Sequence, residues 1–496
     1  MNTNRRGFLQ GVLAAGLAPT IIPAKVLGAD APSKKLQIAI LGCGRVAYTM
    51  DLQGLVNNHD LARLHTLCDI DSARLPVFRD SAIQRYAHYK IDPGDIKLEQ
   101  DYRKVLDDPG IDGVMVCTQD HWHARQVVEA CLKGKDVYVQ KPMAFSPEES
   151  QAIVEAVRKM KRVFHIGTQQ RSDRDITPSF RKGVEYVLSG RLGKIVRIEV
   201  GITDNVPKFE DPFPVRERTP DPKDFDFDLW LGPARADVPY SQLRTHWRIP
   251  EPNGSLPFAG RHGRYMNNGW LQIQDYCTGN ISGWGSHHID IAQWGMGNPG
   301  PISVKGLHAE FLHGRLFNVH DNAIIEYKYA NGVEMIVGTP RYSGFPCGTR
   351  FIGENGDWIF VSRGAMRIAP NKRIDTCRKA KSDVWYSLES NKKALITGEP
   401  EKQVKRDKLG HHRQWFLAMQ ERRDTNITVE EASCSTISCL LGFHAMNNVG
   451  YEIKWDPEKR VFVKPEDMKK FYTCYERKPF STPDALAEIR RKCAKA

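Results

Sequence analysis

The sequence lacks the patterns of several common protein classes. It has no C-x-x-C pair among its 11 cysteines, which disfavours a zinc knuckle or a disulfide framework, so most cysteines are expected to be buried thiols. It has no long run of lysine and arginine: the formal charge of +12 is spread along the chain, which favours a solvated basic surface over nucleic-acid binding. It has no internal repeat or low-complexity segment, and 41% apolar residues are typical of a soluble globular protein.

Residues 1–29 have the pattern of a targeting segment. The pair Arg5-Arg6 precedes an apolar run from Gly11 to Ala18, which is too short to remain as a bilayer anchor. Small residues at Gly28-Ala29 offer a cleavage point. The paired arginines resemble the twin-arginine signal, which exports proteins already folded, so we expect a periplasmic protein without a membrane span in its mature form.

A glycine-rich turn follows this segment. Apolar residues from Leu36 to Leu41 predict a short buried strand that ends at Gly42. The next residues are Gly42-Cys43-Gly44-Arg45-Val46-Ala47, a G-x-G-x-x-A pattern. Gly42 permits the tight turn, Gly44 lets the backbone approach a pyrophosphate, and Ala47 lets the following helix pack closely. The turn, including Cys43, Arg45 and Val46, is a candidate dinucleotide-binding site, although such turns also occur without a ligand.

The second strand predicts which dinucleotide binds. Residues Arg63 to Cys68 form this strand, which ends in Asp69-Ile70-Asp71. An acidic residue about 20 to 27 positions after the glycines is where the ribose hydroxyls are bound, and its charge repels a 2′-phosphate. Asp69 therefore favours NAD over NADP.

The 496 residues are long enough for two domains. Apolar runs alternate with helical patterns up to residue 167, which predicts an α/β domain with a doubly wound parallel sheet over residues 35–167. The expected strands are 113–118, 136–139 and 163–167, and the expected helices are 101–108, 124–133 and 147–160.

Beyond residue 167 the pattern changes to strands that alternate apolar and polar residues. Such strands predict a second α/β domain, residues 168–460, with an open, mostly antiparallel sheet, followed by a C-terminal tail over 461–496. The expected strands are 193–201, 302–308, 322–329, 334–338 and 358–361, and the expected helices are 411–421 and 430–448.

The loop Gln119 to His123 leaves the third strand of the first domain. Loops at the carboxyl ends of parallel strands line the ligand crevice, so Asp120, His121 and His123 are expected to face the cofactor. A metal pair formed by His121 and His123 is the less favoured interpretation, because no carboxylate or cysteine nearby completes a ligand set. No metal is therefore expected.

A long stretch rich in proline and aromatic residues, Pro207 to Trp270, predicts a functional or interfacial loop. It carries Trp230, Trp247 and Trp270. Such side chains suit stacking on a sugar, and they equally suit a core or a subunit interface.

Five motifs together resemble those of one family, the Gfo/Idh/MocA oxidoreductases, over roughly residues 35 to 460. They are Gly42-Cys43-Gly44, Thr118 with Asp120 and His123, Gln140-Lys141-Pro142, Gly167-Thr168-Gln169 with Arg171, and Gly285-Ser286-His287-His288-Ile289-Asp290. The resemblance implies an N-terminal Rossmann domain, an open C-terminal sheet used for homo-oligomerisation, and hydride exchange between a sugar or polyol carbinol and NAD(P).

The resemblance also implies roles for particular residues. The family's E-K-P motif falls on Gln140, Lys141 and Pro142. Lys141 would lie beside the reacting hydroxyl, and Gln140 would bind a ribose hydroxyl without the usual glutamate's charge. His287 would take the family's base position, and Asp290 would be structural. The cofactor candidates also include Thr118, Asp120, His121, His123, Lys141 and Gln169, and the substrate candidates are Lys141, Arg171, Trp247, Asp275, His287 and His288.

Gly283 departs from the family pattern, which places an aspartate there, one helical turn before His287. A glycine cannot orient the imidazole or relay its proton. Three interpretations remain open: another carboxylate such as Asp275 substitutes, Lys141 is the principal base, or the reaction has drifted from ordinary dehydrogenation.

The sequence therefore predicts a periplasmic NAD-dependent oxidoreductase of a sugar or glycoside, acting on a ring carbinol such as C3 of a glucoside. An exported enzyme of this kind is expected to carry its NAD tightly bound. Two alternatives are a redox-neutral glycoside hydrolase, which oxidises, eliminates and re-reduces its substrate, and a non-catalytic sugar-binding partner subunit.

Overall fold

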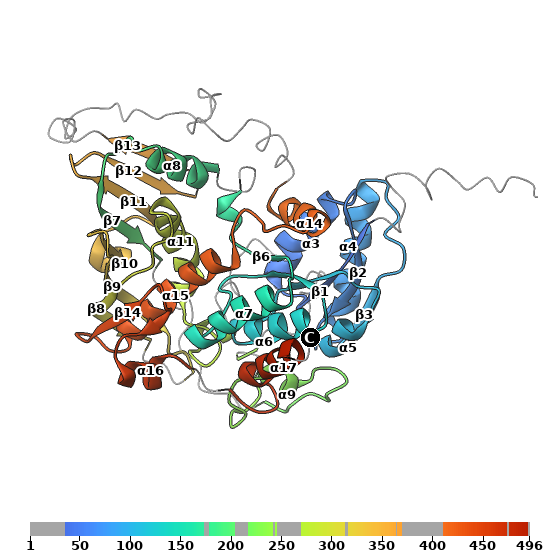
Figure 1. Cartoon of the computed structure of the whole chain (residues 1–496). Helices are drawn as coiled ribbons and strands as arrows, with labels where there is room; N and C mark the ends of the chain where they lie inside the picture. The colour runs from blue at the N-terminus through green and yellow to red at the C-terminus, as the bar shows by residue number, and fades with distance from the viewer. Residues whose placement is uncertain are drawn as a thin grey trace, which may run out of the picture.

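The computed structural model describes residues 35–172, 178–203, 217–241, 244–245, 269–312, 316–363, 365–369, 410–473 and 476–494. The predicted targeting segment, residues 1–29, lies outside the described residues, and so does Trp247. The described chain contains two β-sheets that lie on opposite sides of the molecule (Figure 1).

The first sheet is the predicted doubly wound parallel sheet. Its six strands have the order β3-β2-β1-β4-β5-β6, which is the order of dinucleotide-binding Rossmann domains. They are β1 (Leu36–Leu41), β2 (Ala62–Cys68), β3 (Lys97–Glu99), β4 (Gly113–Val116), β5 (Asp136–Val139) and β6 (Phe164–Ile166). All neighbours pair in parallel, and β1, β4 and β5 are buried because helices cover both faces.

The helices of the first domain follow these strands. They are η2 (Ala47–Asp51, a π-helical turn), α3 (Leu52–Asn57), α4 (Arg74–His88), α5 (Tyr102–Asp107), α6 (Asp120–Leu132) and α7 (Pro147–Lys159). The start of α7 is fixed by a capping box between Ser146 and Glu149. Because α6 begins at Asp120 rather than at the predicted Ala124, the residues Asp120 to His123 lie in its first turn.

The second sheet is mixed and mostly antiparallel, as predicted. Its order is β13-β12-β11-β7-β10-β9-β8-β14-β15, and among its described strands only β7 and β10 pair in parallel. The strands are β7 (Ile195–Gly201), β8 (Ser303–Phe311), β9 (His320–Lys328), β10 (Glu334–Gly338), β11 (Gly348–Gly353), β12 (Trp358–Ser362), β13 (Ala365–Ala369), β14 (Glu452–Asp456) and β15 (Val461–Phe462).

Three helices cover one face of this sheet: α8 (Pro178–Leu188), α11 (Gly285–Gly295) and α15 (Val429–Met446) (Figure 1). On β7, β10 and β11, the polar side chains that alternate with the apolar ones form partly exposed ion pairs. These pairs are Arg197 with Glu334 and Arg350 with Glu199. This alternation explains why β7 and β10 could be recognised from their pattern, whereas β11 was not predicted. The short helices are η3 (Gln169–Arg171), α9 (Phe227–Leu231), η4 (Gly269–Gln272), α10 (Asn280–Gly283), α12 (Pro340–Ser343) and α16 (Pro465–Phe471).

Two C-terminal helices return to the first domain. Helix α14 (His411–Glu421) places Trp415 and Phe416, both fully buried, in one cluster with residues of β1 and β2. Helix α17 (Thr482–Ala494) packs on α6 and α7, so the predicted tail contains two helices, α16 and α17. No helix in the described part of the chain is long and apolar enough to cross a membrane.

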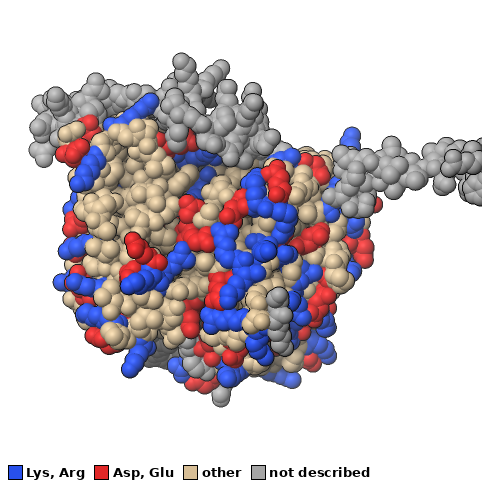
Figure 2. Space-filling view, viewed as in Figure 1, with Lys and Arg blue, Asp and Glu red and all other residues tan. Residues whose placement is uncertain are grey.

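Charges of both signs are interspersed on the face seen in Figure 2. Lysine and arginine gather near the centre of this view, with acidic residues beside them.

Candidate active site

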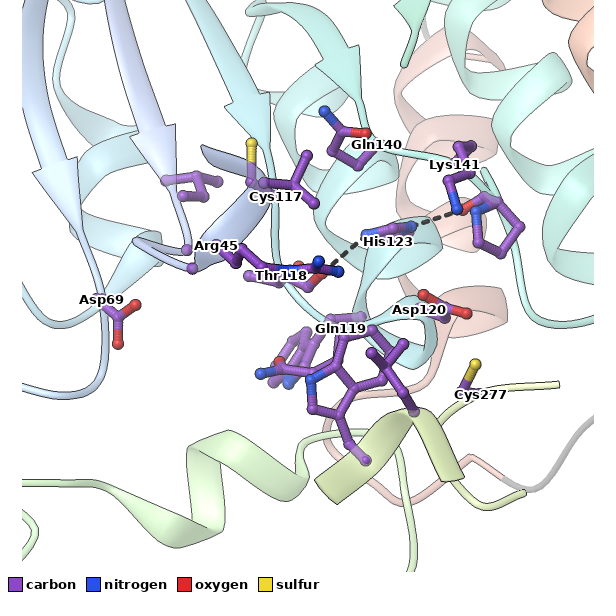
Figure 3. A pocket seen from close by; sticks show the side chains of 18 of the residues that line it. Arg45, Asp69, Cys117, Thr118, Gln119, Asp120, His123, Gln140, Lys141 and Cys277 are labelled. Atoms are coloured by element: carbon purple, nitrogen blue, oxygen red, sulfur yellow. Dashed lines mark hydrogen bonds between the residues drawn. The ribbon is translucent and has the colours of Figure 1, made fainter. Parts of the chain in front are cut away.

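One cavity of about 540 Å³ lies where the glycine-rich turn, the ends of β2, β4 and β5, and the helices α10 and α11 meet. Asp69 lies at one end of it, and Lys141, Asp120 and Cys277 lie toward the other (Figure 3). Most predicted site residues line it: Gly42, Gly44, Arg45, Val46, Asp69, Thr118, Asp120, His123, Gln140, Lys141, Gln169 and His287.

Gly42 and Gly44 of the turn must lack a side chain for different reasons. Gly42 has φ +93°, and a Cβ there would lie 2.7 Å from the carbonyl oxygen of Cys117, so a side chain is excluded by backbone strain and by the neighbouring strand. A Cβ on Gly44 would meet no described atom within 4 Å. Because Gly44 lines the cavity, its bare backbone leaves room for a ligand to approach, as a pyrophosphate requires.

Asp69 is held at the end of β2 by two backbone amides. Its Oδ2 accepts from the N–H of Cys43 at 2.7 Å and its Oδ1 accepts from the N–H of Asp71 at 2.9 Å. Burial raises the pKa of Asp69, while Arg74 opposes the shift. The backbone N–H of Cys43 thus helps to hold the carboxylate in place. Asp69 itself lines the cavity at the position of the ribose-binding acid.

A segment that follows the first domain, residues 223–231, covers this end of the cavity. The N–H of Ser72 donates to the carbonyl oxygen of Asp224 at 3.0 Å, Asp71 forms a β-bridge with Phe225, and the amide of Gln100 donates to the carbonyl of Lys223 at 3.0 Å. Three apolar side chains from this segment line the cavity: Phe225, Leu229 and Trp230.

The two histidines of the α6 turn, His121 and His123, have different surroundings. His123 lines the cavity and connects two loops, with Nδ1 2.6 Å from the carbonyl oxygen of Pro142 and Nε2 3.1 Å from that of Thr118 (Figure 3). His121 instead packs against Trp230 and Tyr276, outside the cavity lining, so its predicted contact with the cofactor is replaced by a packing role. Burial lowers the pKa of both imidazoles to about 4.

The glutamine in the E-K-P position has a structural explanation. The amide of Gln140 donates to both carboxylate oxygens of Asp51, at 2.9 and 2.8 Å, and Asp51 also contacts His412 Nε2 at 2.9 Å. Asp51 is fully buried. A glutamate at position 140 would bring two carboxylates together at this place, which is unfavourable in a buried site, whereas an amide satisfies Asp51.

Lys141 follows β5, and its peptide bond to Pro142 is cis. Its Nζ donates to the carbonyl oxygen of Gly283 at 2.7 Å, which joins the two domains across the cavity. Burial lowers the pKa of Lys141, while Asp120 and Cys277 act in the opposite direction. Burial raises the pKa of Asp120 to about 7, and the charge of Lys141 and a hydrogen bond with Cys277 limit the rise. The cavity therefore holds one carboxyl group, that of Asp120, whose pKa lies near neutral pH, beside a lysine whose pKa is lowered by burial.

His287 lies in the first turn of α11, and its Nδ1 is 2.8 Å from Oε1 of Gln170. Burial lowers its pKa well below the usual value, and the charges of Lys141, His288 and Arg363 lower it further. The imidazole is therefore neutral at physiological pH and able to accept a proton.

Three predicted substrate residues lie away from the cavity lining. Arg171 is 1% exposed and forms a two-point ion pair with Asp290, so it is structural rather than a substrate contact. His288 is 1% exposed, with Nδ1 2.7 Å from the carbonyl oxygen of Gly201. Asp275 is half-buried beside Tyr276, and no hydrogen bond joins it to His287 in the described part of the chain.

Sequence reasoning missed several residues of the site: Gln170, Cys277, Trp284, Arg363 and Asp51. Of these, Gln170 could have been found, because it stands in the loop after β6, at the edge of the sheet where ligands bind. Trp284 and Asp51 lie next to predicted motifs, whereas Cys277 and Arg363 come from segments whose approach to the cavity no local pattern predicts.

The fold and the cavity define an α/β protein with a dinucleotide-binding domain of the Rossmann type. Residues 36–168 match the Gfo/Idh/MocA family model, described as an oxidoreductase family with an NAD-binding Rossmann fold. The family expected from the motifs is thereby supported for the first domain, together with NAD as the cofactor type.

Curated relatives resemble the same part of the chain. The NAD-dependent scyllo-inositol 2-dehydrogenase of Bacillus subtilis is 29% identical over 161 residues, which are 32% of this chain and 42% of the relative. Levoglucosan dehydrogenase of Pseudarthrobacter phenanthrenivorans is 32% identical over 96 residues, 19% of this chain and 24% of the relative. The matched segments thus span less than half of these relatives.

Solved structures resemble most of the chain. Levoglucosan dehydrogenase in complex with NADH and levoglucosan aligns with a TM-score of 0.56 and 16% identity, over 85% of this chain and 99% of that one. The WlbA dehydrogenase of Bordetella pertussis, in complex with NADH and UDP-GlcNAcA, aligns with a TM-score of 0.54 and 15% identity, over 85% and 99%. At this identity the likeness shows the two-domain fold.

Proposed function

We propose that the protein is an NAD-dependent oxidoreductase that acts on a ring carbinol of a sugar or glycoside, such as C3 of a glucoside. The observation that carries the proposal is that Lys141 and His287, which come from different domains, line the same cavity as the glycine-rich turn and Asp69. The names of the related dehydrogenases, which act on inositol and levoglucosan, support a polyol or sugar as the substrate.

The cavity residues fit NAD and suit this chemistry. Gly44 leaves its backbone open to the cavity, and Asp69 would accept from the ribose hydroxyls. Bound NAD would take up the hydride from the carbinol carbon. The hydroxyl proton must leave to a base, and the neutral His287 can accept it, while Lys141 would hold the hydroxyl oxygen in place. Trp270 and Trp284 line the cavity and offer aromatic faces to a sugar ring.

Asp120 favours redox-neutral glycoside hydrolysis as the second candidate. That reaction needs a further acid, which protonates the departing aglycone, in addition to the base at the oxidised carbon. Asp120 lines the same cavity, and burial raises its pKa to about 7, so it can still carry a proton at neutral pH. Release of aglycone without net NADH formation, lost in Asp120→Asn, would distinguish this reaction from simple oxidation.

We further propose that the protein is exported in folded form to the periplasm with NAD bound, and that it assembles through the open face of its second sheet. The paired arginines near the N-terminus support export. The segment that covers the Asp69 end of the cavity, residues 223–231, supports slow release of the cofactor. The ion-paired strand surface formed by Arg197, Glu199, Glu334 and Arg350 supports a polar contact between copies.

The test is to incubate the purified protein with a panel of sugars and glycosides, following nicotinamide absorbance and identifying products by mass spectrometry. Lys141→Met and His287→Ala should each lower turnover by roughly 10² to 10⁴, and the double variant should be little worse than the poorer single one. Lys135→Met is the control, since Lys135 is a buried lysine bound to the carbonyls of Asp108 and Ile111 outside the cavity.

A fully active double variant would exclude the proposed site. Bound NAD without turnover on any member of the panel would instead favour the non-catalytic sugar-binding subunit.

A further inference from the structure

The side chain of Gln170 joins His287 to a buried ion pair. Gln170 is 4% exposed, and its Oε1 lies 2.8 Å from Nδ1 of His287. Its Nε2 donates to Oδ2 of Asp290 at 2.8 Å and to the carbonyl oxygen of Ser286 at 3.3 Å. One amide thus contacts both the imidazole and the carboxylate.

The orientation of this amide is fixed by its surroundings. Asp290 is fully buried and receives hydrogen bonds from Arg171 Nε at 2.9 Å, Arg171 Nη2 at 2.6 Å and Ser435 Oγ at 2.7 Å. A carboxylate paired with a guanidinium can only accept hydrogen bonds. The same is true of the backbone carbonyl of Ser286. The NH₂ group of Gln170 must therefore face them, which leaves its oxygen facing His287.

This arrangement determines which imidazole nitrogen carries the proton. The amide oxygen of Gln170 can only accept, so Nδ1 of His287 must donate. A neutral imidazole has one N–H, so the lone pair then lies on Nε2. Within the described residues Nε2 has no hydrogen-bond partner, and the ring lines the cavity.

We propose that Arg171, Asp290 and Gln170 act as a positioning chain that holds His287 in its Nδ1-protonated tautomer and so keeps Nε2 available as the base of the cavity. The chain would replace the orienting carboxylate that the glycine at position 283 cannot supply. The catalytic consequence rests on the proposed function, whereas the tautomer can be measured without turnover.

The proton transfer needs no rearrangement of this chain. The substrate hydroxyl proton would move to Nε2 as the carbinol C–H bond breaks, and bound NAD would supply the acceptor for the hydride. The resulting imidazolium keeps its Nδ1–H bond to Gln170, and the oxidised carbon becomes a carbonyl. The charged groups that face His287 are Lys141, His288 when protonated, and Arg363, all of which disfavour the imidazolium. The neutral amide of Gln170 does not offset the effect of these positive charges, as a carboxylate would. The histidine therefore stays unprotonated until it reacts.

Two substitutions and one control test the chain. Gln170→Met keeps the length of the side chain and removes its hydrogen bonds to His287, Asp290 and Ser286, whereas Gln170→Glu keeps an acceptor for Nδ1 and adds a charge. Gln293→Met is the control: Gln293 lies on the same helix α11, is fully buried, and donates to Tyr329 and Ser438 without touching His287.

We expect Gln170→Met to lower kcat by roughly 10- to 100-fold with little change in KM, as loss of an orienting partner does. Gln170→Glu places its carboxylate against the buried Asp290 as well as His287, so kcat should fall here too, and the activity that is left should have its acid limb at higher pH, because a carboxylate stabilises the imidazolium. Gln293→Met should leave kcat and the acid limb as they are. A wild-type kcat and acid limb in Gln170→Met, or an acid limb at the wild-type pH in Gln170→Glu, would overturn the catalytic role of the chain.

The second measurement is the ring nitrogen spectrum of the full-length protein with ¹⁵N-labelled histidine, with His287 assigned by its loss in His287→Gln. We expect Nδ1 protonated and Nε2 bare in the wild type, and a shift toward the other tautomer in Gln170→Met. A wild-type Nε2–H would overturn the proposal. If the protein shows the expected tautomer but turns over no sugar, the proposed function is contradicted. The positioning chain is then still supported.

Discussion

The ammonium group of Lys141 lies 2.7 Å from the backbone carbonyl oxygen of Gly283, the residue at which this chain lacks a carboxylate. Gly283→Asp would place that carboxylate one turn before His287 and beside Lys141. A Cβ at this position would meet only Asn280 Oδ1, at 3.3 Å, so the side chain can be accommodated with a small shift.

We expect Gly283→Asp to leave turnover unchanged or lower it, because Gln170 already binds Nδ1 of His287. The new charge should also raise the pKa of Lys141 and shift the pH–rate profile. Profiles of Gly283→Asp and of its uncharged counterpart Gly283→Asn give the measurement. A turnover above that of the wild type would mean that His287 lacks an effective orienting group.

The contact between Gln140 and Asp51 gives a stability prediction. Gln140→Glu places a second carboxylate against the buried Asp51 and should lower the free energy of unfolding by about 1–3 kcal/mol at neutral pH. Adding Asp51→Asn should restore most of this loss, since one carboxylate and one amide then face each other again. Urea unfolding of the two single variants and the double variant measures the coupling; additive losses would show that the two side chains do not interact.

Cofactor choice should depend on Asp69. Asp69→Ser combined with Ile70→Arg removes a repulsive carboxylate and adds a partner for a 2′-phosphate. The ratio of NADP to NAD affinity should rise by about tenfold or more, which corresponds to ~1.4 kcal/mol. Titration of the cofactor-free protein with both nucleotides measures the ratio, with Asp80→Ser, an exposed acid on α4, as the control. An unchanged ratio would mean that Asp69 does not reach the ribose.

Buried histidines should make the protein unstable in acid. Burial lowers the pKa of His121, His123, His288, His320 and His444 to about 4 and that of His165 to about 3. Unfolded histidines titrate near pH 6.5, so from there down to about pH 4 the unfolded chain binds more protons than the folded one. Each group then lowers stability by up to ~1.4 kcal/mol per pH unit as the pH falls.

We therefore expect cooperative unfolding at a pH above 4, accompanied by the uptake of several protons. Circular dichroism against pH together with calorimetry in buffers of different ionisation enthalpy measures both quantities. His444→Gln should reduce the proton uptake by about one. A protein that stays folded at pH 4 would contradict this account of the buried imidazoles.

The sequence predicted the first domain well because its signals are local. The strand from Leu36 to Leu41 is an uninterrupted apolar run, and β5 was placed at its observed bounds for the same reason. Five of the nine strands of the second sheet were predicted from their alternating pattern, namely β7, β8, β9, β10 and β12, whereas β11, β13, β14 and β15 were missed. The helix α4 was missed because it carries many charged residues and a weak apolar face.

Roles that depend on contacts between distant segments could not be predicted. Arg171 belongs to the same motif as Gln169, which lines the cavity. Arg171 itself forms a buried ion pair with Asp290, a residue far along the chain. A carboxylate such as Asp275 was one expected hydrogen-bond partner of His287. In the structure the partner is the amide of Gln170. A carboxylate is the expected partner of a catalytic imidazole, and no residue pattern indicates that an amide has replaced it.

The return of α14 to the first domain constrains when the protein can fold during its synthesis. Trp415 and Phe416 fill a core that β1 and β2 begin to build near the start of the chain. A nascent chain that has released only residues 36–168 exposes this apolar surface, so that fragment is not expected to reach its native state alone. We therefore expect stable binding of the nucleotide only after residues 411–421 have been synthesised, which makes cofactor loading a late event in the synthesis of the chain.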